Sequence, residues 1–445
     1  LDRVFEPPGE EIDWQRLAAA LALQRRLSII TGGAGTGKTT TVVKILTALR
    51  QLDGPAVRIA LAAPTGKAAA RLSEAIRSAK ARMTLPAEEL DGVPEAASTI
   101  HRLLGVRRHS PAFRHNAEHP LPVDCLVLDE ASMVDLALMC KLVDALPPHA
   151  RLILLGDPHQ LAAVEAGSVL DELAGQGANR FSAECAQWLS AATGMAVPAA
   201  EPAAAVLADT VVELQVTHRN TGNIVRLAEA VKRGDAAQAL AMLDDPAAAD
   251  AGWHPGGDGQ WLDAGMQREI RAWFDSYRQA APAEALARLD DFRVLCAHRE
   301  GAAGVGAVNA LIERSLRRAG AIAGGDWYPG RPVMVTRNDY ALGLYNGDVG
   351  VCLPDAAGTL RVWFPGSQEP RAFAPGRLPE HETVYAMTVH KTQGSEFGRI
   401  LLLLPERESP IVNRALLYTA VTRARTAVRI FGSPRLLTAA CRLVR

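Results

Sequence analysis

A glycine-rich run between an apolar stretch and an amphipathic stretch is the feature that most limits how this chain can fold. Residues 27–31, LSIIT, have the composition of a buried strand, and GGAGTGKT follows at 32–39. Further on, Val42, Ile45 and Leu46 keep the i, i+3, i+4 spacing of one helix face. A strand, a loop of the pattern G-x-x-x-x-G-K-[ST] and a helix, in this order, predict a P-loop rather than an ordinary glycine-rich turn.

A P-loop binds nucleotide phosphates through its backbone N–H groups, helped by the positive end of the helix that follows. Lys38 is expected to reach the β- and γ-phosphates of ATP, and Thr39 is expected to bind Mg²⁺. The expected nucleotide-binding residues are those of the loop and the first helical turn: Gly32, Gly33, Ala34, Gly35, Thr36, Gly37, Lys38, Thr39 and Thr40.

Three further segments carry side chains suited to phosphoryl transfer. The apolar run CLVL ends in Asp129 and Glu130, which we expect to hold Mg²⁺ and to activate the attacking water. Gln160, in GDPHQL, is placed to sense the γ-phosphate or to position that water. Gln15, in DWQRL, has an amide that could bind the adenine edge. The alternatives are an ordinary turn for Gln160 and a solvated helix residue for Gln15.

Phosphoryl transfer also gains from a cation supplied from outside the P-loop, an effect of roughly 10³–10⁵ in rate. Two arginines in the second half are candidates, Arg219 in THRN and Arg423 in YTAVTRAR. Arg423 is preferred because an apolar, helix-like run precedes it and would fix its position. Arg425, two residues later, would point elsewhere on a helix. Either candidate could instead be a surface arginine.

Alternation of apolar runs and helical patterns predicts α/β structure with mostly parallel sheets. Residues 191–209 are rich in Ala and Pro and predict a connection between two such blocks. Residues 331–379 differ, with short, closely spaced strand patterns separated by Gly, Pro and Asn-Gly turns. This texture predicts a small β-barrel inserted in the second block.

Bulk properties exclude several classes of protein. The net charge is −1, so a wholly basic surface is excluded but a local basic groove is not. The six cysteines have neither zinc nor redox spacing, which predicts free thiols in a reducing cytoplasm. No apolar run reaches the ~20 residues of a membrane span, so we expect no membrane association. The chain opens without Met, and we expect an N-terminal region to be missing.

Taken in order, the P-loop, APTGKAAARL (63–72), TIHRLL (99–104), DEAS, GDPHQL, TVHKTQGSEF (388–397) and YTAVTRAR resemble the motifs of superfamily 1 helicases. Together with LPEHE, GRPVM and LGLYNGD they closely resemble the RecD family, the alpha subunit of exodeoxyribonuclease V, or RecBCD. The likeness extends from about residue 8 to the end of the chain. A RecD chain normally carries a further N-terminal domain that contacts RecC.

The resemblance implies two RecA-like domains with ATP between them, and an SH3-like β-barrel inserted in the second. The implied boundaries are 1–210 for the first domain, with a short insertion at about 80–120, then 211–328 and 385–445 for the second, and 329–384 for the barrel. It also implies 5′-to-3′ movement along single-stranded DNA with a 5′ tail, and RecB and RecC as partners.

In TVHKTQGSEF, the resemblance implies that Thr388, His390 and Lys391 face DNA phosphates, whereas Gly394 and Glu396 face the nucleotide. One loop would then touch both ligands. The full set of expected DNA contacts, each of which could instead be an ordinary polar strand end, is Thr65, Lys67, Thr99, His101, His298, Arg337, Asn338, Thr388, His390 and Lys391. Trp327, Tyr328 and Tyr345 could stack bases, but we favour a place in the barrel core.

Two regions depart from the pattern. His218 precedes Arg219 where relatives tend to have an aromatic residue, and residues 235–290 match no motif and look helical. No carboxylate spacing of a nuclease is present, so nuclease activity would belong to RecB. Two other functions stay open: a free-standing RecD-like helicase, and a P-loop ATPase that switches without translocating.

Overall fold

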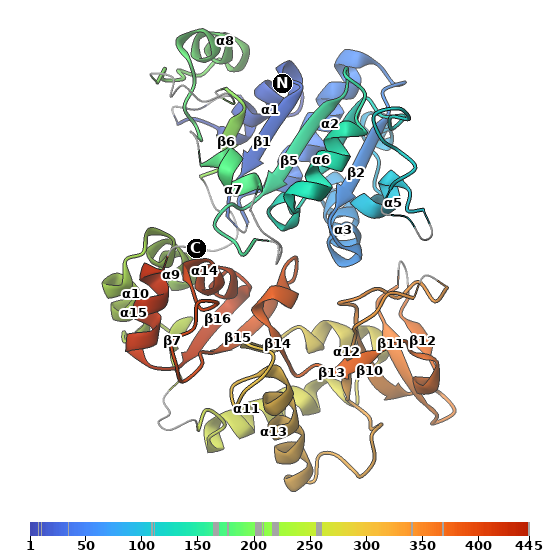
Figure 1. Ribbon diagram of the computed structural model, residues 1–445, viewed down its shortest axis with the longest axis vertical. Helices are drawn as coiled ribbons and strands as arrows, with labels where there is room; N and C mark the ends of the chain where they lie inside the picture. Colours follow the sequence, from blue (N-terminus) through green and yellow to red (C-terminus); the bar gives the residue numbers. More distant parts are fainter. Residues whose placement is uncertain are drawn as a thin grey trace. The chain divides into compact units, whose positions relative to one another are not determined.

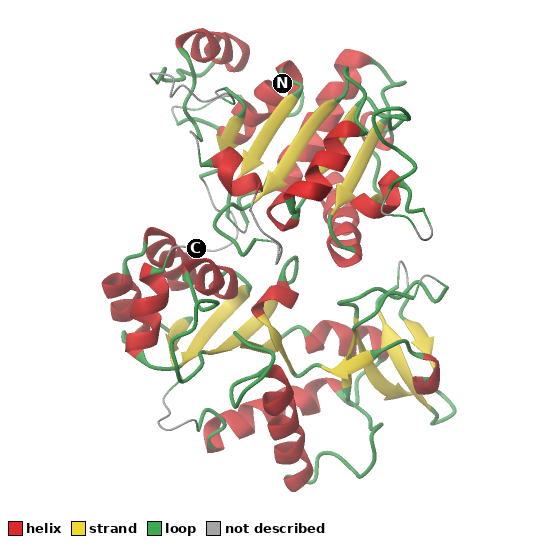
Figure 2. Ribbon diagram, viewed as in Figure 1, coloured by secondary structure: helices red, strands yellow, loops and turns green. Residues whose placement is uncertain are grey.

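The computed structural model describes residues 1–445 except 8, 10, 34, 108–109, 111, 163–168, 176–177, 201–206, 208, 216–221, 255–259, 340, 367–368 and 444–445. The chain divides into two units, Leu1–Arg219 and Asn220–Arg445. Figure 1 shows the elements of each unit, and Figure 2 distinguishes helices from strands. Among the described residues, no helix is long and apolar enough to cross a membrane.

The described part of the first unit is built on a six-stranded sheet in the order β3-β2-β4-β5-β1-β6, with every neighbouring pair parallel. Its strands are β1 (Leu27–Thr31), β2 (Ile59–Ala63), β3 (Ala97–Thr99), β4 (Cys125–Leu128), β5 (Arg151–Gly156) and β6 (Val211–Glu213). Its helices are α1 (Trp14–Gln24), α2 (Lys38–Asp53), α3 (Gly66–Arg82), α4 (Ala87–Asp91), α5 (Ile100–Leu104), η1 (Ala131–Met133), α6 (Leu136–Asp144), α7 (Val169–Ala174) and α8 (Ala183–Thr193).

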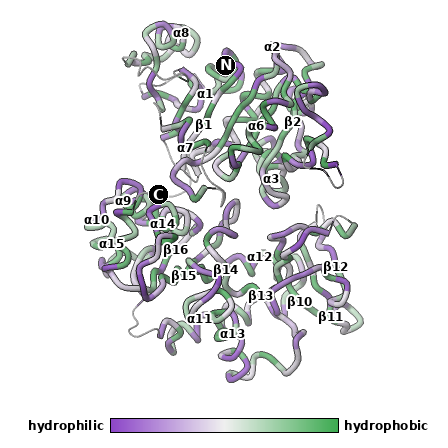
Figure 3. The backbone as a smooth tube through the Cα atoms, in the orientation of Figure 1, coloured by the Kyte–Doolittle hydropathy of each residue, from purple (hydrophilic) through white to green (hydrophobic). Residues whose placement is uncertain are grey.

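Both faces of this sheet are buried, which is why its strands are continuously apolar (Figure 3). Ile30 belongs to a core with α1, α2, α3 and α8, whereas its neighbour Ile29 belongs to a core with α5, α6 and α7. Successive side chains of a strand point to opposite faces, so one five-residue strand contributes to two cores.

The second unit has its own parallel sheet, in the order β14-β8-β15-β16-β7 among the described residues. Its strands are β7 (Ala251–Trp253), β8 (Phe292–Cys296), β14 (Ala386–Thr388), β15 (Phe397–Leu403) and β16 (Ala424–Phe431). The helices are α9 (Asn223–Arg233), α10 (Ala236–Leu243), α11 (Ala264–Tyr277), α12 (Pro282–Leu289), α13 (Val305–Arg318), η3 (Val389–Thr392), α14 (Arg414–Val421) and α15 (Pro434–Arg442).

Between α13 and β14 the chain forms a separate antiparallel sheet in the order β12-β11-β10-β9-β13. Its elements are β9 (Pro332–Val335), β10 (Val349–Pro354), β11 (Leu360–Phe364), β12 (Arg371–Phe373), η2 (Pro375–Arg377) and β13 (His381–Thr383). Val333, Cys352 and Phe364 lie in its core. The predicted fold class, two parallel α/β sheets with an antiparallel β insertion in the second, is confirmed.

Two short strands differ from the sequence predictions. Residues 191–209 were predicted to connect the two blocks, but β6, which follows them, still pairs with β1 at the edge of the first sheet. Residues 235–290 were expected to be helical, yet β7 pairs in parallel with β16. Both strands have three residues, so their long-range pairing, rather than a local pattern, determines where they belong.

Contacts at the return from the insertion fix β14, the edge strand of the second sheet. The Asn309 side chain on α13 donates to Ala386 O at 3.1 Å and accepts from Ala386 N at 2.8 Å. This amide satisfies edge groups that would otherwise be unpaired. Nearby, the hydroxyls of Tyr328 and Tyr385 lie 3.0 Å apart. Tyr328 was expected in the barrel core, but it packs with Tyr385 in the core of the parallel sheet.

We expect Asn309→Ala to destabilise the second unit by about 2–4 kcal/mol, because it leaves a buried N–H and a buried C=O of Ala386 unpaired. Urea denaturation would measure the change in the free energy of unfolding. Gln238→Ala, which removes an exposed amide on α10, is the control and should change it by less than about 0.5 kcal/mol. Equal effects of the two substitutions would show that the Asn309 contacts contribute nothing.

Candidate functional site

The loop between β1 and α2 has a backbone that only glycine adopts easily. Gly32, Gly35 and Gly37 have φ angles of 154°, 80° and 85°. A Cβ on Gly32 would also lie 2.7 Å from Thr36 Oγ1. Thr36 Oγ1 donates to Gly33 O at 3.0 Å, which closes the loop on itself. Ala34 lies outside the described residues. These glycines turn the chain sharply into α2, as a phosphate-binding loop requires.

Lys38 is the first residue of α2, and its ammonium folds back over the loop. It donates to Gly32 O at 2.6 Å and to Gly33 O at 2.9 Å. Thr39 and Thr40, in the same helical turn, are half-buried. The cation and the N-terminal amides of α2 therefore lie at the same end of the helix, where an anion is favoured.

Asp129 and Glu130 follow β4, two strands away from β1 in the sheet order. Burial and the neighbouring Glu130 carboxylate raise the pKa of Asp129 to about 6, and Lys38 partly opposes this rise. Glu130 has a φ of 52°, in the left-handed region that few non-glycine residues adopt. Lys38 and the two acids are thus brought together from segments about 90 residues apart.

Gln160 follows β5, the strand between β4 and β1. Its side chain is buried at 5% exposure, and Nε2 donates to Asp157 Oδ2 at 3.1 Å. Asp157 also accepts from His159 N at 3.1 Å. Sequence reasoning missed Asp157, although its place three residues before Gln160 is the spacing of a turn whose acid binds the following residues.

Gln15 lies in the first turn of α1, which Asp13 caps by accepting from the backbone N–H groups of residues 15 and 16. Gln15 Nε2 donates to Thr36 O at 3.1 Å. The amide therefore contacts the phosphate loop directly, and its expected contact with adenine stays a prediction. The alternative, that Gln15 is a solvated helix residue without a contact, does not fit this hydrogen bond.

In the second unit, the loop 393–396 and the first residue of β15 lie against Arg423. Arg423, which follows α14, is 4% exposed and donates from Nη1 to Ser395 O at 3.2 Å and from Nε to Thr419 O at 3.2 Å. Its own carbonyl accepts from Phe397 N at 2.8 Å. Gly394 has a φ of 67°, and Glu396 is half-buried. Arg425 is exposed, but it lies in β16 and not on the helix that the sequence predicted for it, because α14 ends at Val421. Arg219 lies outside the described residues.

All three threonines expected to contact DNA cap helices. Thr65 accepts from Ala68 N at 3.2 Å at the start of α3, and Thr99 accepts from Arg102 N at 3.2 Å at the start of α5. Thr388 accepts from Lys391 N at 3.4 Å at the start of η3. Capping uses a lone pair of each hydroxyl and leaves its hydrogen free to be donated.

The other expected DNA contacts have mixed surroundings. Lys67 is half-buried in the first turn of α3, and the exposed His101 packs edge-on against Phe113 with ring centroids 5.7 Å apart. His298 follows β8, and burial lowers the pKa of His390. Asn338 accepts from Asn346 N at 2.8 Å. All these assignments stay predictions.

Two of the expected DNA-binding cations are paired with carboxylates of β13 and its flank. Lys391 Nζ lies 3.2 Å from Glu382 Oε1, and Arg337 Nη1 lies 3.3 Å from Glu380 Oε1. Both acids belong to LPEHE, a segment for which the sequence patterns predicted no binding or catalytic role. Their charge was visible in the sequence, but their partners were not.

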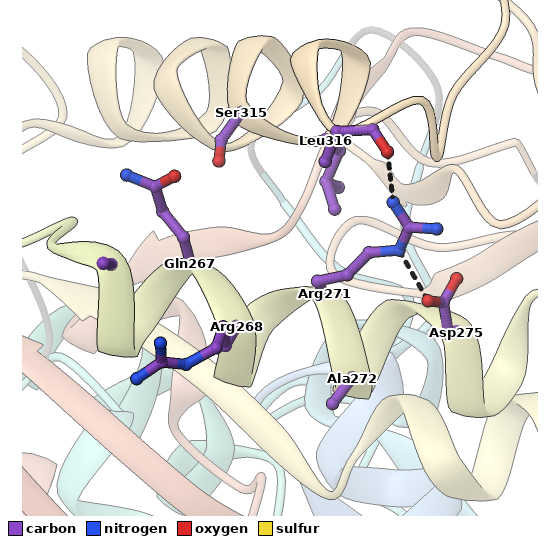
Figure 4. A pocket seen from close by; sticks show the side chains of 9 residues that line it. Gln267, Arg268, Arg271, Ala272, Asp275, Ser315 and Leu316 are labelled. Carbon is purple, nitrogen blue, oxygen red and sulfur yellow. Dashed lines mark hydrogen bonds and ion pairs between the residues drawn. The ribbon is translucent and has the colours of Figure 1, made fainter.

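A separate hollow of about 490 Å³ lies between α11 and α13 (Figure 4). Gln267, Arg268 and Ser315 line it, and none of the predicted site residues does. Arg271 at its edge donates to Asp275 and to Ala319 O at 2.8 Å, which ties the two helices together. The hollow therefore belongs to the packing of these helices.

A segment of each unit matches a known protein family. Residues 15–166 match a family described as an AAA domain, and residues 383–431 match one described as a UvrD-like helicase C-terminal domain. A solved structure concerns the unwinding of forked double-stranded DNA by two coordinating Pif1 helicases. It is 16% identical to this chain with a TM-score of 0.49, and the match covers 96% of this chain and 94% of that one.

Two curated proteins are much more similar in sequence. The chain is 32% identical to the ATP-dependent RecD2 DNA helicase of Deinococcus radiodurans, over 92% of this chain and 47% of that protein. It is 42% identical to the RecBCD enzyme subunit RecD of Mycolicibacterium smegmatis, over 97% of this chain and 72% of that protein. With this identity and coverage, the chain belongs to the RecD family.

Proposed function

We propose that this chain is an ATP-driven helicase that moves 5′ to 3′ along single-stranded DNA, as the RecD subunit of a RecBCD-type enzyme acting at DNA double-strand breaks in recombinational repair. The observation that carries the proposal is a loop of positive-φ glycines leading from β1 to Lys38, with Asp129 and Glu130 after β4 of the same parallel sheet. Membership of the RecD family supports DNA as the track and RecB and RecC as partners.

Each nucleotide-site residue then has a role in hydrolysis. The Lys38 ammonium exchanges two loop carbonyls for phosphate oxygens, and the α2 amides bind the same anion. A bound Mg²⁺, held by Thr39 and Asp129, would offset the charge on the phosphates. Glu130 accepts a proton from the attacking water, and Asp157 holds the Gln160 amide in place to orient it. Gln15 supports the loop from outside and contacts adenine.

Movement requires that the nucleotide alter the grip on DNA. The first half of the segment 388–397 contains Thr388 and Lys391. Near its end, the backbone of residues 395 and 397 is hydrogen-bonded to Arg423. A displacement of Arg423 would move the segment with it, so both ends are coupled through one short stretch of chain. The helix-capping threonines and the basic residues hold phosphates rather than bases, so the motor would tolerate any DNA sequence.

Two other functions predict different behaviour. A free-standing helicase, favoured by the similarity to RecD2, would not bind RecC, so pull-down of a full-length version with RecC separates it from a RecBCD subunit. A non-translocating ATPase switch would hydrolyse ATP at the same rate with and without oligo-dT. We expect oligo-dT to stimulate the rate.

Unwinding of tailed substrates tests the direction of movement. We expect a duplex with a 5′ single-stranded tail to be unwound in the presence of ATP, and a duplex with a 3′ tail to stay intact. Strand separation on native gels would measure both, with a blunt duplex as the control. Preference for the 3′ tail would contradict the proposed polarity.

Lys38→Ala should lower the rate of ATP hydrolysis by about 100-fold or more, because it removes the cation that faces the transferred phosphoryl group. Steady-state phosphate release in the presence of oligo-dT is the measurement. Lys80→Ala is the matched control: its ammonium pairs with Glu95 at 2.7 Å near the opposite end of α3 from Thr65, and it should leave hydrolysis near the wild-type rate. Normal turnover in Lys38→Ala would refute the nucleotide site.

Asp129→Asn should stabilise the protein while abolishing hydrolysis. An ionised carboxylate buried beside Glu130 raises the energy of the folded state, so we expect the free energy of unfolding to rise by about 1–3 kcal/mol in Mg²⁺-free buffer at pH 7.5. Urea denaturation and phosphate release would measure the two effects.

Asp124→Asn, just before the same strand, is the control with the opposite expectation. Arg58 donates to Asp124 at 2.7 and 3.0 Å and holds the pKa of that carboxyl below its usual range. Its replacement should lower stability and keep hydrolysis. If Asp129→Asn also lost stability, Asp129 would be a structural residue.

A further inference from the structure

We propose that Arg299 is an additional contact for a DNA phosphate, and that Glu382 is a built-in counter-ion that competes with that phosphate for Arg299 and Lys391. This inference rests on the proposed function, because it assigns a further part of the same DNA-binding surface. Arg299 directly follows His298, an expected DNA contact, and nothing in the sequence pattern distinguishes it from the other arginines.

One carboxylate binds both cations. Glu382 Oε1 lies 3.2 Å from Lys391 Nζ, and Glu382 Oε2 lies 3.0 Å from Arg299 Nη2. Each carboxylate oxygen has its own partner. The spacing of the two cations therefore suits an anion that binds through two oxygens. A phosphodiester also offers two unesterified oxygens, and it binds Lys and Arg by the same charge-assisted hydrogen bonds.

The register of the second sheet explains why these cations meet. Strands β8 and β14 are parallel neighbours, and Thr388 pairs with Cys296 at their carboxyl ends. Lys391 and Arg299 each lie three residues beyond one of these paired ends. The sheet therefore delivers two cations to one edge, from parts of the chain about 90 residues apart.

Glu382 comes from a different direction. It lies in β13, opposite Met334 of β9, and belongs to the inserted antiparallel sheet. Only three residues separate it from the start of β14, so the return of the chain to the parallel sheet carries this carboxylate onto the cations. With two positive charges and one negative, the group keeps a net positive charge that attracts an anion.

A purely structural role for this bridge is a weaker explanation. Arg299 is 66% exposed, and Lys391 and Glu382 are 28% and 26% exposed. Exposed ion pairs contribute little to stability. The junction between the two sheets is already held by buried bonds, Asn309 to Ala386 and Tyr328 to Tyr385. The exposure also leaves the cations accessible to a strand of DNA.

The same arrangement recurs beside it. Glu380 directly precedes β13 and lies two residues before Glu382. Glu380 pairs at 3.3 Å with Arg337, another expected DNA contact, and both are largely exposed. A phosphate that binds the cations at either place must displace the carboxylate from them or share them with it. The acids would thus weaken the grip and make it easier to release at each step.

Anisotropy of a fluorescent oligo-dT, titrated at several salt concentrations, tests the inference. Glu382→Gln keeps the side-chain shape and removes the competing charge, so we expect about five-fold tighter binding at low salt. Arg299→Ala should weaken binding by a similar factor and reduce the slope of log K against log salt concentration by about 0.7. Arg299→Lys, which keeps the charge, should restore most of that slope.

Glu284→Gln is the matched control, because it removes one negative charge from an exposed pair with Arg288 on α12, before β8. It should leave binding unchanged. Equal or weaker binding by Glu382→Gln, or an unchanged slope in Arg299→Ala, would overturn the inference. If Glu382→Gln does not fold, the two Arg299 variants decide alone.

Failure of the proposed function would look different. The wild-type chain would then neither bind oligo-dT nor hydrolyse ATP faster in its presence. A wild-type chain that does both, together with variants that miss the expected shifts, would leave the motor intact and remove only Arg299 and Glu382 from its DNA contacts.

Discussion

Parallel strands end at the same edge of a sheet, and the chemistry of this chain depends on that constraint. In the order β4-β5-β1, the residues that follow three adjacent strands are Asp129, Gln160 and Lys38, which are far apart in sequence. The second sheet repeats the principle with β14 and β8, whose ends lead to Lys391 and Arg299. Both groups of side chains are products of strand order, which explains why short motifs can be scattered along the chain and still act together.

The carboxyl-end edges of both sheets have backbone N–H groups that need partners, and the chain satisfies several of them with side chains that could also bind phosphate. Thr65, Thr99 and Thr388 accept amide hydrogens at helix starts and keep a hydroxyl hydrogen to donate. Capping and phosphate binding are therefore compatible in one residue. This explains why a threonine at such a position cannot be assigned to structure or to function from its capping bond alone.

The sequence predicts what local patterns determine. The P-loop, the acids after β4 and the antiparallel insertion have signatures within a few residues, and the fold class follows from them. The existence of β7, the bond from Asp157 to Gln160 and the partners of Glu382 could not be predicted in this way. A three-residue apolar run fits either sheet, and a carboxylate gives no indication of its partner. In each case register and distant pairing decide, and these are properties of the folded chain.

In the mechanism that we propose, Asp129 and Glu382 are carboxylates that serve the motor in two different ways. Asp129 is buried, and its charge destabilises the folded protein while no cation is bound. Binding of a cation would relieve this destabilisation, which adds to the free energy of cation binding. Glu382 is accessible, and its charge already satisfies two cations, so DNA gains only the difference between phosphate and carboxylate. The first arrangement favours tight binding of the nucleotide, and the second favours a reversible grip. A translocating enzyme needs both, because a step along the strand requires one ligand to be consumed while the other is released and bound again.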